Sequence, residues 1–174
     1  TNLSADTYTV EVTDGNGCSE TATVTISENP AVTASITSST DVTCNGGSDG
    51  EATVTAGGGT GTYSYLWDDS SGQSTSTATN LIAGTYTVEV TDGNGCSETA
   101  TVTISENPAL TAVISTSSDV TCNGGSDGQA SVTAGGGTGS GTYSYLWDDA
   151  SVQTTATATN LSAGTYTVEV SDGN

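Results

Sequence analysis

Apolar and polar residues alternate along this chain in short runs, a pattern typical of β-strands with one buried face. In one run, Tyr86, Val88 and Val90 fall on one face, and the Thr and Glu residues between them fall on the other. The sequence Asp-Gly-Asn-Gly-Cys follows from Asp92 to Cys96 and is a strong hairpin signal. The pattern therefore predicts a strand that ends in a tight turn.

The same alternation predicts further strands on both sides of this run. Ala100, Val102 and Ile104 share one face of the strand after the hairpin. Turns rich in Gly, Asn, Asp and Ser separate the other expected strands, which cover residues 31–42, 51–56, 63–67 and 73–79. Short strands with turn signals about every 8–12 residues predict an all-β, immunoglobulin-like β-sandwich. No stretch has the period of a helix.

The pattern also repeats at long range. The run from Asn80 to Cys96 occurs earlier as residues 2–18 and begins again at residue 160, which gives repeat lengths of 78 and 80 residues. The two extra residues come from one insertion in a Gly/Thr-rich loop, which covers residues 57–63 in one repeat and 135–143 in the next, and such loops tolerate insertions.

We predict three parts: residues 1–30 as the C-terminal part of one repeat, 31–108 as a complete β-sandwich repeat, and 109–174 as the next repeat, truncated before its last strand. We interpret the chain as a window from a longer tandem array. Glu106-Asn107-Pro108 is the predicted linker, since Pro cannot pair in a central strand.

Composition narrows the possible functions. The chain has no Lys, Arg or His and carries a net charge of −20. It cannot neutralise phosphates, so nucleic acid and anionic membrane surfaces are excluded as partners. No apolar run reaches the roughly 18–20 residues of a membrane helix, so membrane insertion is not predicted. No His or Lys is present to activate a Ser nucleophile, and nothing besides paired carboxylates suggests glycoside hydrolysis, so we predict no enzyme activity.

Four cysteines, Cys18, Cys44, Cys96 and Cys122, recur at spacings of 26, 52 and 26 residues. In an all-β chain without His, they indicate disulfides rather than zinc, and hence an oxidising, extracellular setting. We predict a Cys44–Cys96 disulfide within one repeat, with Cys18 and Cys122 pairing beyond this window. Such a loop of about 50 residues could stabilise the fold by ~4 kcal/mol. The alternative joins neighbouring repeats through Cys18–Cys44 and Cys96–Cys122.

Four motifs together resemble the SprB-type repeat of very large surface adhesins of gliding bacteria. They are Cys-Asn-Gly-Gly-Ser-Asp-Gly (from Cys44 and Cys122), a Gly-rich loop leading to Tyr-x-Tyr-x-Trp, Asn-Leu-x-Ala-Gly-Thr-Tyr-Thr-Val, and Asp-Gly-Asn-Gly-Cys. The resemblance covers essentially the whole chain. It implies secreted, cell-surface tandem β-domains exported by a type IX route, without enzyme activity. The Tyr/Trp and Gly-Thr-Tyr portions also resemble polycystic-kidney-disease-type sandwich domains.

Acidic turns are candidate cation sites, because hard oxygen ligands in loops suit Ca²⁺. The residues are Asp14, Asn16, Asp49, Asp92 and Asn94. None of these turns matches the full calcium-loop spacing, and Asp and Asn are also the usual turn residues. We therefore expect no cofactor, with structural Ca²⁺ as the alternative.

Tyr63, Tyr65 and Trp67 alternate on one face of a predicted strand, just before Asp68 and Asp69. An aromatic strip beside carboxylates could stack on a sugar, but a buried Trp on this strand is what a sandwich core needs. We expect core positions for this Trp and for its counterpart Trp147. Tyr86 and its counterpart Tyr166 are further core candidates, with Tyr86 the candidate for a corner tyrosine.

The outward strand faces are rich in Thr and Ser and lack the Lys that usually protects sheet edges. Charge repulsion, a glycan coat or assembly into filaments could take its place. Asn2 and Asn160 lie in glycosylation sequons, and O-glycans on Thr and Ser are the other possibility.

The sequence thus predicts a structural tandem-repeat segment of a secreted cell-surface adhesin or extracellular fibre. Its partners would be neighbouring repeats of the same chain, and possible further partners are other copies and glycans. The alternative is a repeated carbohydrate- or Ca²⁺-dependent binding module that uses Tyr65, Asp68 and Asp69.

Overall fold

A computed structural model describes residues 2–138 and 141–173 of the chain. Residues 139 and 140, in the loop that carries the predicted insertion, lie outside the described residues, as do Thr1 and Asn174. The secondary-structure elements assigned within the described ranges are all β-strands, and neighbouring strands in each sheet run antiparallel. The all-β prediction is confirmed.

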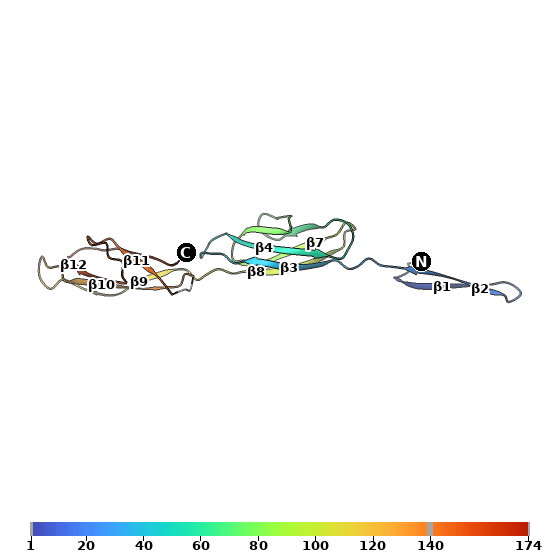
Figure 1. Cartoon of the computed structure of the whole chain (residues 1–174), viewed down its shortest axis with the longest axis horizontal. Coiled ribbons are helices and arrows are strands. Elements are labelled where there is room, and N and C mark those ends of the chain that lie inside the picture. The colour runs from blue at the N-terminus through green and yellow to red at the C-terminus, as the bar shows by residue number, and fades with distance from the viewer. Residues whose placement is uncertain (1, 139–140, 174) are drawn as a thin grey trace.

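The strands form three groups, which we call units 1, 2 and 3. Unit 1 contains β1 (Asp6–Thr13) and β2 (Ser19–Ile26). Unit 2 contains β3 (Thr33–Thr40), β4 (Gly50–Gly57), β5 (Ser64–Trp67), β6 (Thr77–Leu81), β7 (Gly84–Thr91) and β8 (Ser97–Ile104). Unit 3 contains β9 (Thr111–Ser118), β10 (Gly128–Gly135), β11 (Ser144–Trp147), β12 (Thr157–Leu161) and β13 (Val168–Ser171). The units lie in a row, with most strands along the long axis (Figure 1).

Unit 2 is a sandwich of two three-stranded sheets, with strand orders β3-β4-β6 and β5-β7-β8. The two sheets meet where β3 lies beside β8. Just beyond these strands, Val42 forms a parallel bridge with Glu106. This arrangement confirms the predicted immunoglobulin-like β-sandwich.

The core of unit 2 uses the positions that alternation predicts. Trp67, Leu81, Val88, Val90 and Ile104 are at most 2% exposed. They come from four strands of both sheets, so their burial holds the two layers together. Each fully buried aliphatic side chain contributes about 1.5–3 kcal/mol relative to leaving it exposed. The prediction of a core Trp is confirmed for Trp67.

Units 1 and 3 bury less of the same pattern. In unit 1, β1 and β2 pair as β7 and β8 do, yet Val10 and Val12 are 57% and 66% exposed. Their counterparts, Val88 and Val90, are fully buried. The difference arises because no second sheet covers the β1–β2 hairpin within the described residues. The alternating pattern is therefore enough to predict a strand, but the apolar face of that strand is buried only where a second sheet packs against it.

One strand differs from its predicted position. The sequence predicts strand structure over residues 73–79, but β6 covers Thr77–Leu81. The side-chain amide of Gln73 instead pairs with the backbone of Thr79, as the backbone of a neighbouring strand would. Its Oε1 accepts a hydrogen bond from the Thr79 amide at 3.0 Å, and its Nε2 donates to the Thr79 carbonyl at 2.9 Å.

Candidate functional site

A tyrosine corner is present in each unit. The Tyr86 hydroxyl donates to the Ile82 carbonyl at 3.0 Å, as the corner prediction expects. Tyr8 and Tyr166 make the same bond to the carbonyls of Ser4 and Ser162, each at 3.0 Å. The corner therefore fixes the start of the same strand three times along the chain.

The two predicted sequons lie beside these corners. Asn160 is the penultimate residue of β12 and has φ +57°, a conformation that Asn tolerates better than most residues, and its side chain is exposed. The Ser162 hydroxyl lies 3.1 Å from the Tyr166 hydroxyl. Asn2 is also exposed. The serine of each sequon thus has a structural role, because Ser4 and Ser162 both lie at a tyrosine corner. Glycosylation at Asn2 and Asn160 stays a prediction.

The aromatic strip of unit 2 belongs to the sandwich. Trp67 is 1% exposed, and its Nε1 donates to the Thr75 carbonyl at 2.9 Å. The Tyr63 hydroxyl donates to the Gly58 carbonyl at 2.5 Å, and Tyr65 packs half-buried against the core. Trp67 consequently offers no open ring face for stacking a sugar.

The two carboxylates after this strip organise the following turn. Asp68 Oδ1 accepts from the Thr87 amide at 2.8 Å. Asp69 accepts from the amides of Gln73 at 2.8 Å and Ser71 at 3.0 Å. Burial raises the pKa of Asp69, but the hydrogen bonds from these two residues outweigh it, so the pKa lies below its usual value. Both carboxylates are held as structural acceptors.

A cavity of about 490 Å³ lies beside this turn. Its wall includes Asp68, Asp69, Gln73, Asn80 and Tyr86. It is the place in unit 2 where the predicted binding module would hold a ligand.

The hairpin aspartate of unit 2 closes two loops at once. Asp92 Oδ1 accepts from the amides of Asn94 and Cys96, each at 2.9 Å. Its Oδ2 accepts from the Thr60 amide at 2.9 Å and so holds the Gly-rich loop between β4 and β5. These donors, with Thr60 first and Cys96 second, hold the pKa of Asp92 below its usual value. Asp92 is only 6% exposed.

The other predicted cation residues occupy separate places. Asp14 bonds to the amides of Asn16 and Cys18 in the unit 1 hairpin, each at 2.9 Å. Asp49 bonds to the hydroxyl and amide of Thr43, which lower the pKa of Asp49, at the other end of unit 2 from Asp92. Among the described residues, no three His, Cys, Asp or Glu side chains gather to hold a metal ion. The predicted residues share a structural role, which is to close turns, and Ca²⁺ binding at them stays a prediction.

The linker between units 2 and 3 is bonded to unit 2 by side chains. Glu106 Oε2 accepts from the Gly46 amide at 2.6 Å. Asn107 Nδ2 donates to the Thr43 carbonyl at 3.0 Å, and Asn45 Nδ2 donates to the Asn107 carbonyl at 3.1 Å. The turn that contains Cys44 is therefore tied to the linker.

The same linker is bonded to unit 3 by its backbone. The Pro108 carbonyl accepts from the Gly137 amide at 2.9 Å. The next residue in that loop, Thr138, donates its amide to Asp172 Oδ2 at 2.8 Å. Gly137 has φ +70°, and a Cβ there would lie 2.3 Å from the Asp172 carboxylate. Only glycine lets the loop reach both partners.

A cavity of about 210 Å³ marks this junction. Thr43, Cys44 and Asn45 of unit 2 line one part of it. Gly137, Thr138 and Asp172 of unit 3 line another part, with the linker between them. The junction brings together residues more than 90 positions apart in the sequence, such as Cys44 and Gly137.

The predicted Cys44–Cys96 disulfide does not form in this fold. All four cysteines are exposed free thiols. Cys44 lies near the last residue of β8, where Val42 bridges Glu106, whereas Cys96 precedes the first residue of β8. A strand of eight residues separates them by roughly 25 Å, and a disulfide needs Cα atoms about 4.4–6.8 Å apart. The spacing of cysteines in sequence did not reveal that they lie at opposite ends of the sandwich.

Residues 36–72 and 114–152 match the family model described as the SprB repeat. The chain carries SprB-type repeats. The two matched segments begin in β3 and β9 and run through the cysteine turn, the Gly-rich loop and the buried Trp. Such repeats are modules of cell-surface proteins.

Among solved structures, the chain is similar to the three N-terminal domains of the bacteriophage RB49 Highly Immunogenic Outer Capsid protein (Hoc). The TM-score is 0.45 and the sequence identity 21%, over 83% of this chain and 55% of that one. The chain thus spans about half the length of that structure. No curated protein matches the chain. In the portions that the structure describes, no helix is both long and apolar enough to cross a membrane.

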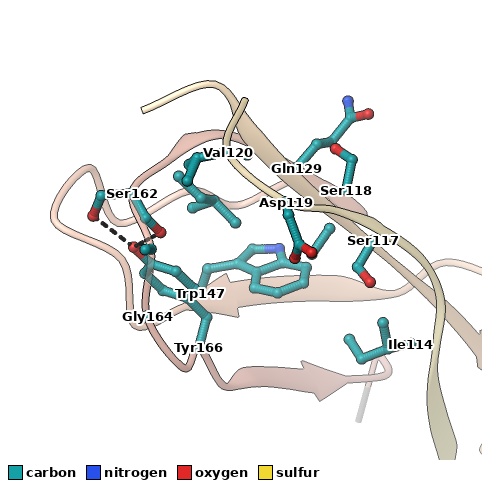
Figure 2. Close-up of a pocket in the computed structure, with 14 residues that line it drawn as sticks. Ile114, Ser117, Ser118, Asp119, Val120, Gln129, Trp147, Ser162, Gly164 and Tyr166 are labelled. Carbon is teal, nitrogen blue, oxygen red and sulfur yellow. Dashed lines mark hydrogen bonds between the residues drawn. The ribbon is translucent and has the colours of Figure 1, made fainter. Parts of the chain in front are cut away.

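A groove in the second SprB-type repeat, unit 3, has a structural explanation. It encloses about 480 Å³ over Trp147, between Asp119 and Val120 on one side and Tyr166 on the other (Figure 2). In unit 2, β8 occupies the corresponding position, where Ile104 packs onto Gly50. The groove is therefore a strand position of the sandwich and not a ligand site.

Sequence reasoning missed the acceptors and donors that build the repeat junction. It treated Glu106-Asn107-Pro108 as a linker but gave no role to its side chains. The signal was present, because Glu-Asn-Pro occurs at the same place in the preceding repeat, as residues 28–30. The partners of Asn107 lie more than 60 residues earlier in the chain, which no local pattern can show.

Proposed function

We propose that this chain is a non-catalytic structural segment of a secreted cell-surface adhesin or extracellular fibre, in which SprB-type repeats form a rod. The observation that carries the proposal is the linker bonded at both ends. Glu106 and Asn107 bond to unit 2, and Pro108 bonds to unit 3. Such bonds restrict bending between repeats, and contacts between neighbours add stability along an array.

Charge and chemistry support the same proposal. The chain has 20 acidic residues and no basic ones, so like-charge repulsion favours a soluble, extended rod. Asp68, Asp69 and Asp92 accept backbone hydrogen bonds, which is a structural use of carboxylates. Glycans on the exposed Asn2 and Asn160 and lateral association into filaments are parts of this proposal.

Electron microscopy of the native secreted material tests the rod. Each repeat spans strands of eight residues plus the turns at both ends, so we expect filaments with an axial repeat of roughly 35–45 Å. Extra density beside Asn2 or Asn160 positions would identify glycans. Compact, separate particles would contradict the proposal.

A second candidate function is a carbohydrate- or Ca²⁺-dependent binding module, with the cavity beside Asp68 and Asp69 as its site. Tyr65, the third residue of that interpretation, is half-buried against the core. Thermal unfolding with and without Ca²⁺, together with a glycan-array screen, tests it. Sugar binding that Asp69→Asn abolishes would favour the module, and a rod without ligand would give neither signal.

A further inference from the structure

Each complete sandwich carries its two cysteines at opposite ends. We call the end where β3 begins and the β7–β8 hairpin turns the leading end, and the end where β8 finishes the trailing end. Cys96 lies at the leading end of unit 2, in the turn that Asp92 closes. Cys44 lies at the trailing end, in the turn tied to Asn107. A trailing end faces the leading end of the next unit (Figure 1).

The junction of units 2 and 3 shows what Cys44 faces. It lines the 210 Å³ cavity together with Asp172. Asp172 is the unit 3 counterpart of Asp92, because both accept the amide of the Gly-rich loop through Oδ2, from Thr138 and Thr60 respectively. The cavity therefore joins the cysteine turn of one unit to the hairpin start of the next.

The hairpin places its cysteine directly opposite this aspartate. In unit 2, the Asp92 amide donates to the Cys96 carbonyl at 2.9 Å, and the Cys96 amide donates back to Asp92 Oδ1. The two residues are next to the last ladder pair of the hairpin, Thr91 and Ser97, so they lie opposite each other at its turn. In unit 1, Asp14 and Cys18 make the same pair of bonds. The turn geometry is thus a property of the repeat.

We propose that the trailing-end cysteine of one repeat forms a disulfide with the hairpin cysteine of the following repeat. This pairing rests on the tandem rod proposed above and locks its junctions covalently. In a chain where unit 3 carries the hairpin of unit 2, the cysteine four residues after Asp172 lies beside the cavity that Cys44 lines. In this pairing, Cys18, Cys96 and Cys122 have their partners in repeats other than those described.

The bond forms by thiol–disulfide exchange with a low-molecular-weight disulfide, such as oxidised glutathione. The two cysteine thiols lose two protons and two electrons and gain one S–S bond. The donor disulfide breaks and leaves as two thiols, which take up those protons and electrons.

Thiol counting on two chains tests the pairing. The first is the 174-residue chain with its four cysteines. The second is the same chain extended by a copy of residues 95–108, which completes unit 3 and adds a fifth cysteine. After incubation with oxidised and reduced glutathione, we expect four free thiols in the first chain. In the second we expect three free thiols and one disulfide between Cys44 and the added cysteine.

Peptide mapping identifies the bond. Glu-C cuts after Glu28 and Glu51, so Cys44 lies in peptide 29–51, and it cuts after Glu169, so the added cysteine lies in a peptide that begins at Val170. That peptide carries Ser171, whereas the peptide of Cys96 carries Thr91 at the same place, so their masses differ.

Matched variants complete the test. Cys44→Ser in the extended chain should leave every remaining thiol free, while Cys96→Ser should keep the disulfide. A single free thiol in the extended chain would overturn the proposal, because both the Cys44–Cys96 pattern and the Cys18–Cys44 pattern leave one. Five free thiols would overturn it as well. Filaments that lack this disulfide would contradict the crosslink but would still support the rod proposal.

Discussion

At the residue scale, single polar groups close the turns of this protein. Asp92 accepts three backbone amides, and Tyr86 donates one hydroxyl to the carbonyl four residues earlier. Both contacts lie at strand ends, where backbone groups lack partners in a ladder. The tyrosine contact occurs in all three units, so the repeats share this hydrogen bond as well as their sequence.

Tyr86→Phe should lower the free energy of unfolding of unit 2 by about 1 kcal/mol, because it removes one hydroxyl-to-carbonyl hydrogen bond. Urea unfolding followed by Trp67 fluorescence, in a Trp147→Phe background, measures it. Tyr65→Phe is the matched control, since no hydrogen bond of that hydroxyl is present among the described residues. Equal losses for the two variants would show that the corner bond is not the cause.

Asp92→Asn should destabilise unit 2 at neutral pH and progressively less in acid. The folded-state pKa of Asp92 is lowered, so its contribution is present above the unfolded pKa of about 3.9 and is lost as the pH falls through the folded value. Urea midpoints of both chains between pH 7 and pH 2.5 give the difference as a function of pH. A difference that stays constant over this range would contradict the assignment.

At the scale of elements, the linker decides how two sandwiches meet. The linker is hydrogen-bonded to a turn of unit 2 and to a loop of unit 3. Asp49 closes that turn, and Asp172 holds that loop. The preceding linker, residues 28–30, has the same sequence but no side-chain hydrogen bond from Glu28 or Asn29 among the described residues. Within the described residues, the linker side chains therefore form these hydrogen bonds only where the cysteine turn of the preceding unit is present.

The double variant Glu106→Ala/Asn107→Ala should loosen the junction without unfolding either unit, because it removes only the side-chain bonds to residues 43–46. Small-angle X-ray scattering should show a shorter mean maximum dimension and a broader distance distribution. Glu28→Ala/Asn29→Ala is the matched control and should leave the profile unchanged. If both variants change the profile alike, the side-chain bonds do not set the junction.

At the scale of the whole molecule, uniform negative charge opposes compactness. With a net charge of −20 and no cation in the chain, every charge pair is repulsive. The elongated row of units spreads these charges, so the shape and the composition favour each other (Figure 1). Added salt shortens the range of this repulsion.

Raising NaCl from about 0.01 M to about 1 M should raise the melting temperature of the chain, since the Debye length falls from ~30 Å to ~3 Å. Differential scanning calorimetry in a salt series measures the shift. The rise should level off once screening is complete, and an equal concentration of a neutral osmolyte is the control for general exclusion effects. A melting temperature that falls or stays flat with salt would show that repulsion does not limit stability.

The sequence by itself determined the strands, the repeat and the sandwich class. Alternation at Val88 and Val90 and the Asp-Gly-Asn-Gly turn are local signals, because a strand's two faces and a tight turn depend on neighbouring residues. The buried Trp67 followed from its place in the strand order.

Only the tertiary structure decided what the ends of each sandwich do. Sequence spacing favoured Cys44–Cys96, but the direction of β8 puts those two residues at opposite ends of unit 2. The contacts of Asn107 and Asp172 likewise depend on which loops meet after the sheets have packed. Contacts between residues far apart in the chain depend on the packing of whole sheets, and so no local pattern encodes them.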